Sequence, residues 1–81
     1  MSETHQHVAE ALDLRGEVCP YTFVKSKLAL EEMESGQVLR VIVDNPGSAQ
    51  NVPRSLSSEG HQILGVDKLN ETDWAITVKK G

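Results

Sequence analysis

The sequence predicts an α+β fold, a two-layer α/β sandwich in which two helices cover one face of a mixed four-stranded sheet. The first observation is length, because 81 residues make one domain with a thin core. The second is the succession of strand-like and helix-like segments in the order β-α-β-α-β-β. The third is a short polar turn between the last two strands, which makes them antiparallel neighbours. We expect a flexible N-terminal tail at residues 1–7, which are polar and aperiodic, and a single domain at residues 8–81.

The first strand is expected at residues 8–14. Its hydrophobic side chains Val8, Leu12 and Leu14 fall on one side, while charged residues point the other way, as in a half-buried strand. Gly16 ends the strand.

The first helix is expected to follow directly. Pro20 suits a first helical turn, where its missing N–H group is not needed. The segment is rich in Ala, Leu, Glu and Lys and runs to about Ser35, with Gly36 as its C-terminal stop. Its apolar residues divide over the helix surface, with Tyr21, Val24 and Leu28 on one face and Leu30 and Met33 off it.

A central strand is expected at residues 37–44, which are rich in β-branched side chains. Leu39, Val41 and Val43 form one of its faces. The segment is mostly apolar on both faces, which is typical of a strand with neighbours on either side.

The second helix is expected to be short. Residues 45–48 indicate a turn or a helix entry. Because proline inside a helix removes a hydrogen bond, we expect Asn51 to be the N-cap and Pro53 to lie in the first turn. Val52 and Leu56 then face the core one turn apart.

The last two strands are expected at residues 61–69 and 74–79. Gly65 interrupts the first of them, which predicts a β-bulge. Residues 70–73 form a hairpin turn, and strict alternation of apolar and polar residues follows it.

Composition limits the function classes. A net charge of −4 argues against a nucleic-acid-binding protein, which needs a basic surface. The sequence shows neither an apolar stretch of membrane-spanning length nor an apolar signal segment, so we expect a cytoplasmic protein without membrane contact. A single cysteine excludes an internal disulfide. His5 and His7 make no convincing metal site, so we expect neither a metal nor a cofactor.

Cys19, in the segment GEVCPYT, falls between the first strand and the first helix. Backbone N–H groups and the positive end of the helix dipole gather at a helix start, and both favour a thiolate over a thiol. A lone cysteine is more often a small buried hydrophobe. A helix start between a glycine-containing loop and a proline is seldom deep core, however. We therefore predict that Cys19 is a nucleophile and that Pro20 places it at the helix start.

The residues around Cys19 narrow its chemistry. Thr22 stands where a dithiol redox enzyme has its second cysteine, so Cys19 cannot complete an intramolecular thiol–disulfide cycle. Nothing in the sequence indicates that His61 lies close to Cys19, so a catalytic Cys-His pair is not predicted. A single thiol can accept a group, hold it and hand it on, and sulfur carried as a persulfide fits that description.

The motif LDLRG-EV-CP, residues 12–20, resembles the opening signature of the TusA/SirA-like sulfurtransferase family. The segments DNP at 44–46 and NVP at 51–53 match this family as well, and the resemblance extends over about residues 10–79. It implies a sulfur carrier that holds a persulfide on Cys19. Because a relay intermediate is often a monomer when unbound, we expect a monomer. As donor it implies a cysteine desulfurase or a rhodanese-type protein, and as acceptor a DsrE-type or tRNA-thiolation protein.

One position departs from the family pattern. The family usually has CPxP, whereas this chain has CPYT, so Thr22 replaces a proline. The N–H and hydroxyl groups of Thr22 can both donate to the sulfur, which predicts a lower pKa for the Cys19 thiol. Alternatively, threonine is merely tolerated early in the helix. Arg15, also in the motif, either steers an anionic sulfur donor or acceptor towards Cys19 or is a solvated charge at the strand end.

Two other functions remain open. CPYT is one substitution from the CPYC of glutaredoxins, which suggests a monothiol glutaredoxin-like redox protein. The Val52-Pro53 pair imitates the substrate-binding proline of that class, but no apolar strand follows Pro53. The third possibility is a regulatory interaction module in which Cys19 is incidental.

Overall fold

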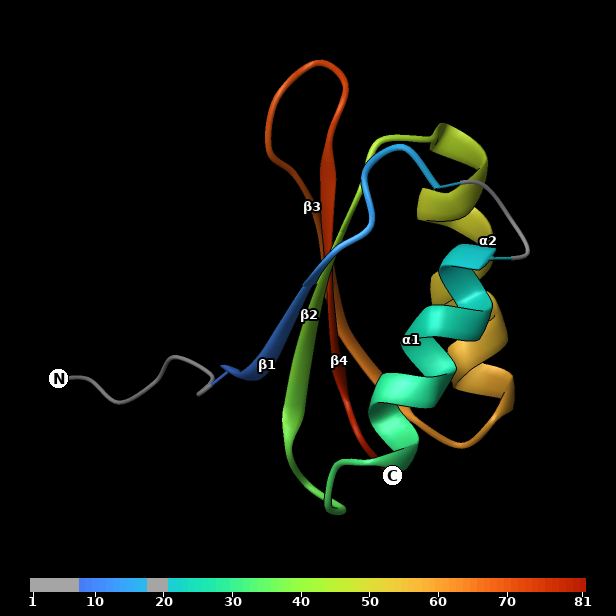
Figure 1. The fold of residues 1–81 in the computed structure, drawn as a ribbon, viewed down its shortest axis with the longest axis vertical. Coiled ribbons are helices and arrows are strands. Elements are labelled where there is room, and N and C mark those ends of the chain that lie inside the picture. Colours follow the sequence, from blue (N-terminus) through green and yellow to red (C-terminus); the bar gives the residue numbers. More distant parts are fainter. Residues whose placement is uncertain (1–7, 18–20) are drawn as a thin grey trace, which may run out of the picture.

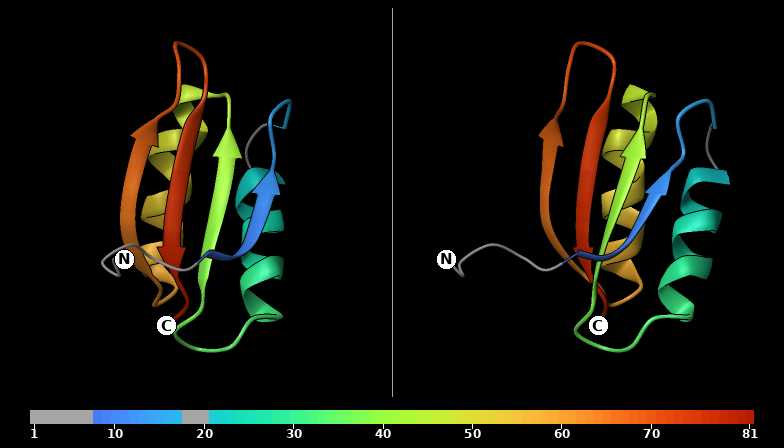
Figure 2. Two further views of the ribbon diagram at one scale, coloured as in Figure 1. Left: turned by 90° about the vertical axis from the view of Figure 1, so that its left-hand side faces the viewer. Right: turned by 60° about the vertical axis from the view of Figure 1, so that its left-hand side comes forward.

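A computed structural model describes residues 8–17 and 21–81 as two layers, a sheet with both helices on one of its faces (Figure 1 and Figure 2). In chain order the elements are β1 (Val8–Asp13), α1 (Tyr21–Glu31), β2 (Val38–Val43), α2 (Pro46–Ser58), β3 (Gln62–Lys68) and β4 (Trp74–Lys79). The predicted α+β sandwich and its element order are confirmed. The tail predicted at residues 1–7 lies outside the described residues, as do Cys19 and Pro20. Neither helix of the described part is long and apolar enough to cross a membrane.

The sheet is mixed, with its strands in the order β1-β2-β4-β3. β1 and β2 are parallel, because α1 carries the chain back between them. β4 runs antiparallel to both β2 and β3. β2 is therefore a central strand, as predicted. The carboxyl ends of β1 and β2 meet at one end of the sheet, and both helices start from that end (Figure 2).

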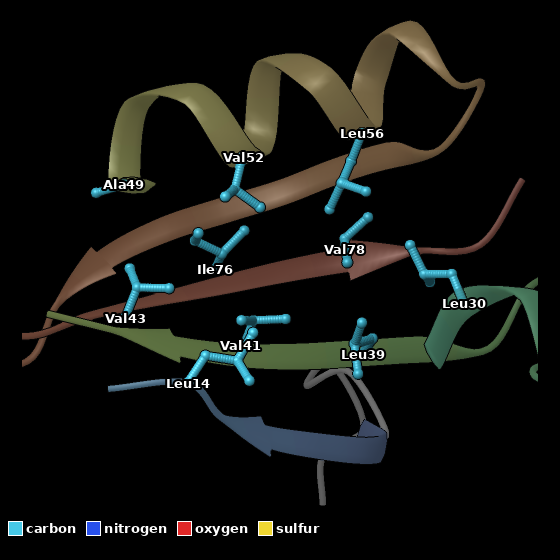
Figure 3. Close-up of a cluster of buried hydrophobic side chains, with 10 residues drawn as sticks. All are labelled: Leu14, Leu30, Leu39, Val41, Val43, Ala49, Val52, Leu56, Ile76 and Val78. Atoms are coloured by element: carbon cyan, nitrogen blue, oxygen red, sulfur yellow. The ribbon is translucent and has the colours of Figure 1, made fainter. Parts of the chain in front are cut away.

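The core lies between the sheet and the two helices (Figure 3). Leu39, Val41 and Val43 of β2 are fully buried, as their alternation predicts, and Ile76 and Val78 of β4 lie beside them. The helices and the end of β1 complete this cluster with Leu14, Leu30, Ala49, Val52 and Leu56.

β1 is more exposed than the half-buried strand that the sequence predicts. A register shift follows Val8, which pairs with Val38 on the face turned away from the helices. Leu12, by contrast, pairs with Val41 on the core face. The prediction that Val8 and Leu12 share a side is therefore wrong, because a one-residue shift turns the start of the strand to the other face.

α1 buries a face that its apolar residues do not mark. Thr22, Ser26 and Leu30 are completely buried. The apolar residues Tyr21, Val24 and Leu28 are exposed instead.

α1 also ends earlier than expected, at Glu31. The chain tightens there, and the N–H group of Met33 donates to the carbonyl of Leu30 at 3.0 Å. Gly36, at a φ of 93°, does not end the helix. It belongs to a separate turn that the N–H group of Gln37 closes on the carbonyl of Glu34 at 3.0 Å.

α2 begins earlier than expected. Its N-cap is Asn45 rather than Asn51, and the Asn45 Oδ1 accepts the N–H groups of Gly47 and Ser48 at 2.8 and 3.2 Å. Pro46 occupies the first helical position, where the missing N–H group costs nothing.

Pro53 lies in the interior of α2, contrary to the prediction of a first-turn position. A proline there removes one hydrogen bond of the helix. The helix continues because Val52 and Leu56, both fully buried, hold it against the sheet around the proline. Their position towards the core agrees with the prediction.

β3 and β4 form the predicted hairpin. The register shift between Ile63 and Gly65 is the predicted bulge. In the turn, the Asn70 Oδ1 accepts the N–H groups of Thr72 and Asp73 at 2.8 and 3.0 Å, which explains why these residue types form a turn.

Candidate functional site

The connection from β1 to α1 includes Cys19, and its first residues are held by burial and hydrogen bonds. Leu14 is buried, and its N–H group donates to the carbonyl of Ile42 at 2.8 Å, beyond the end of β1. Gly16 follows at a φ of 91°, which glycine adopts without strain. Its N–H group donates to both carboxylate oxygens of Asp44, at 3.0 and 3.1 Å. Asp44, directly after β2, therefore holds the chain three residues before Cys19.

The other end of the connection is held by α2. Thr22, in the first turn of α1, is completely buried, and its Oγ1 lies 3.2 Å from the Oγ of Ser48 in the first turn of α2. Either hydroxyl can donate. Ser26 adds a hydrogen bond from its Oγ to the Thr22 carbonyl at 2.8 Å. These contacts hold the chain three residues after Cys19.

Two helix N-termini therefore lie side by side at the end of the sheet where β1 and β2 finish (Figure 1). α1 begins two residues after Cys19, and α2 begins three residues after β2. The positive ends of both helix dipoles converge on this end of the molecule. Each helix end stabilises a nearby surface anion by about 0.3–1 kcal/mol. The arrangement therefore favours negative charge in its vicinity.

Two parts of this arrangement were not predicted from the sequence. The expected N-cap of the second helix was Asn51, whereas the N-cap is Asn45, closer to the connection that includes Cys19. The signal for the true start was the pair Asn45-Pro46 at the end of β2. In the sequence, Asp44 is notable only as part of the DNP segment that matches the family. Its contact could not be predicted, because an exposed carboxylate after a strand gains its role only when the fold brings Gly16 to it.

Arg15 is engaged with carboxylates of its own chain. Its Nε and Nη2 donate to the two oxygens of Asp13 at 2.9 and 2.7 Å, and its Nη1 lies 3.6 Å from Asp73 Oδ2 in the hairpin turn. These hydrogen bonds lower the pKa of Asp13 to about 2 and raise the pKa of Arg15. The pKa of Asp73 is lowered by a hydrogen bond from Asn70 and by Arg15. Arg15 thus links the end of β1 to the hairpin, and its single positive charge lies between two carboxylates.

Of the residues predicted for the site, Arg15 and Thr22 lie in the described part of the chain. They belong to separate networks, since Arg15 contacts Asp13 and Asp73 whereas Thr22 contacts Ser48. Within residues 8–17 and 21–81, no group of three His, Cys, Asp or Glu side chains is placed to hold a metal ion.

Comparison with known proteins yields a family match over most of the chain. Residues 10–80 match the model of the family described as sulfurtransferase TusA. A protein of Archaeoglobus fulgidus named "putative sulfur carrier protein" is 55% identical over 71 residues, 88% of this chain and 81% of that protein. The Escherichia coli protein TsuB, with the same description, is 34% identical over 90% of this chain and 97% of its own length.

Solved structures show the same fold. A SirA-like protein from Desulfitobacterium hafniense superposes with a TM-score of 0.78 at 32% identity, over 89% of this chain and 97% of that one. A protein from Helicobacter pylori superposes with a TM-score of 0.65 at 24% identity, over 86% and 95% of the two chains. The second likeness concerns the fold alone.

Proposed function

The chain belongs to the TusA family of sulfurtransferases, and on this basis we propose that it accepts sulfane sulfur as a persulfide on Cys19 and passes it to a partner protein. Cys19 is the only cysteine of the chain, so this thiol alone can serve. Pro20 and Thr22 support it from the start of the helix, and Arg15 precedes it in the same motif.

The observation that carries the proposal is the convergence of two helix N-termini beside the residues that flank Cys19. Sulfur transfer needs a thiolate, and nearby positive potential raises the fraction of the thiol that is ionised at neutral pH. One exposed helix end supplies about 0.3–1 kcal/mol, less than the roughly 1.4 kcal/mol that shifts an ionisation equilibrium tenfold. Two helix ends together reach that range.

The transfer balances in atoms and electrons. The Cys19 thiolate attacks the terminal sulfur of a persulfide on the donor protein. A new S–S bond forms at Cys19 while the donor S–S bond breaks, and the donor cysteine leaves as a thiolate with the electron pair. Release repeats the step, with an acceptor thiolate attacking the terminal sulfur on Cys19. Neither direction consumes an oxidant or a reductant.

The partners follow from this chemistry and from the family. The donor is a cysteine desulfurase or a rhodanese-type protein, and the acceptor is a DsrE-type or tRNA-thiolation protein. Such a relay requires no cofactor and no direct contact with nucleic acid. We propose that the chain acts as a cytoplasmic monomer that meets each partner in turn.

Intact-mass analysis tests the proposal. The protein is incubated with a cysteine desulfurase and L-cysteine, or with rhodanese and thiosulfate. We expect a gain of one sulfur atom that a thiol reductant removes, and peptide mapping should place it on Cys19. In a parallel incubation with glutathione disulfide, a stable glutathione adduct on Cys19, formed as one glutathione leaves as a thiolate, together with no gain of sulfur from the sulfur donors, would instead indicate a glutaredoxin-like protein. Failure to gain sulfur from either protein donor or from a small persulfide would refute the carrier function.

Thr22 is expected to keep the pKa of the Cys19 thiol lower than proline would in its place. The substitution Thr22→Pro removes a backbone N–H group from the first turn of α1 and the hydroxyl that meets Ser48. The thiol of the variant should therefore ionise at higher pH. The pH dependence of thiolate absorbance and of the rate of alkylation measures this.

The substitution Thr22→Val separates the two donors, because valine keeps the N–H group and the side-chain shape but lacks the hydroxyl. If the pKa of the Cys19 thiol rises only in Thr22→Pro, the Thr22 N–H group is responsible for the effect. If this pKa rises in both variants, the Thr22 hydroxyl contributes as well. If the pKa in Thr22→Pro equals that of the wild type or lies below it, threonine is merely tolerated here.

A further inference from the structure

α1 carries an apolar stripe on its exposed face, which we call the α1 stripe and define as Tyr21, Val24 and Leu28. These residues are 59%, 42% and 56% exposed. Spacings of three and four residues place them along one side of the helix. The stripe begins two residues after Cys19.

The opposite face of α1 makes this stripe unusual. Thr22 and Ser26 occupy fully buried positions and satisfy their hydroxyl groups through Ser48 and the backbone. Full burial of a large apolar side chain stabilises a fold by about 1.5–3 kcal/mol. The exposed residues of the α1 stripe do not contribute this full stabilisation to the fold. Contiguous exposed apolar residues of this kind mark sites of protein association.

A groove of about 350 Å³ adjoins the stripe, between α1 and the edge strand β1. Figure 2 shows α1 lying over the β1 side of the sheet. The groove is lined by the apolar residues Leu12, Leu28, Ala29 and Met33 and by the carboxylates of Glu10 and Glu32. Leu28 belongs to both the stripe and the groove, so the two form one continuous surface.

The charges around this surface differ along the helix. Near the start of α1, Lys25 is paired with Glu17 at 2.9 Å, and Lys27 is paired with Glu59 at 3.5 Å. Among the residues that the structure describes, no cationic side chain is paired with the groove carboxylates of Glu10 or Glu32. Lys80 also lies in this region, where its Nζ donates to the carbonyl of the groove residue Met33 at 2.7 Å. The groove therefore has two carboxylates and one cation that is bound to a backbone carbonyl, which leaves an excess of negative charge.

We propose that the α1 stripe and the groove form the docking surface for the protein that donates sulfur to this chain, and that the donor presents an apolar surface bearing a lysine or arginine. The charge follows from the groove carboxylates, which a cation would neutralise. The apolar part follows from the α1 stripe. This inference rests on the proposed function, because the donor is defined by its sulfur.

The test compares sulfur loading from protein donors with loading from a donor too small to need docking. The protein donors are a cysteine desulfurase with L-cysteine and rhodanese with thiosulfate, and the small donor is glutathione persulfide. The apolar part is tested by Val24→Gln combined with Leu28→Gln. Its matched control is Leu69→Gln, since Leu69 is 44% exposed beside the hairpin turn.

The acidic part is tested by Glu10→Lys combined with Glu32→Lys. Its matched control is Glu71→Lys, a charge reversal at an exposed position of the hairpin turn. Thermal unfolding establishes that each variant is folded. All variants keep Cys19 and the residues that hold its connection.

We expect both double variants to load about tenfold more slowly than the wild type from the protein donor that serves it, the change that corresponds to roughly 1.4 kcal/mol of lost contact. Loading from glutathione persulfide should change less than about twofold in every variant, because no docking is involved. Both controls should match the wild type with all donors.

Several results would overturn the inference while leaving the carrier function intact. The first such result is that the wild type and both double variants load sulfur from the protein donors at equal rates. The second is that the wild type takes sulfur from glutathione persulfide but from neither protein donor. A wild-type dimer that the stripe substitutions dissociate, seen by sedimentation equilibrium, would assign the surface to a second copy of the chain. Absence of loading from all donors would instead refute the proposed function.

Discussion

Replacing Cys19 by alanine is expected to abolish sulfur loading from every donor while leaving the protein folded. The reason is that the chain has one cysteine, so no second thiol can take over. Intact-mass analysis after incubation with desulfurase and L-cysteine measures the loss directly. Thermal unfolding and circular dichroism check that the variant keeps its fold.

This variant also separates the carrier from its alternatives. A regulatory module would keep its effect on partner proteins in Cys19→Ala, whereas a carrier loses transfer although it can still dock. Serine in place of Cys19 is the matched control for size and polarity and should be equally inactive. Sulfur gained by either variant would contradict the assignment of the persulfide to Cys19.

Leu39→Ala is expected to lower the free energy of unfolding by about 2–5 kcal/mol. Leu39 is completely buried on the central strand β2 and lies opposite Val78 of β4, so its removal leaves a cavity between sheet and helices (Figure 3). For a domain of 81 residues this is a large part of the total stability. Urea unfolding should show a lower midpoint with an unchanged slope. Tm should fall by at least about 8 °C.

Leu28→Ala is the matched control, with the same atoms removed from the exposed side of α1. We expect a change of less than about 0.5 kcal/mol, because Leu28 is more than half exposed and alanine favours a helix. Equal destabilisation by the two substitutions would mean that α1 buries its apolar stripe rather than the face with Thr22 and Ser26.

The position of Pro53 bears on the glutaredoxin-like alternative. In the sequence, Val52-Pro53 imitates the substrate-binding proline of glutaredoxins, but no apolar strand follows it. In the structure Pro53 lies within α2, on the helical layer of the sandwich. A proline there cannot serve as the residue that precedes a sheet strand and contacts a bound thiol. The resemblance of CPYT to CPYC is therefore confined to a short segment of sequence.

Much of the candidate site was readable from local sequence, and the rest was not. Cys19 could be singled out because a cysteine before a proline, after a glycine-containing loop, indicates a helix start. The role of Asp44 could not, since its partner Gly16 is 28 residues away in the chain. The contact between Thr22 and Ser48 was equally hidden, because small hydroxyl residues carry no hydrophobic signal and their pairing depends on how two helices pack.

The sequence by itself determined the order of the elements, the burial of β2 and the bulge at Gly65, and it singled out the cysteine that we propose as the sulfur carrier. Strand alternation and turn residues act over a few neighbouring positions, so they can be read without knowing the fold. Only the tertiary structure decided which face of α1 is buried, where α2 begins beside it and that two helix N-termini converge. The apolar residues of α1 do not lie on a single face, so the sequence does not predict which side of the helix packs against the sheet. Packing also decided which surface of α1 stays exposed.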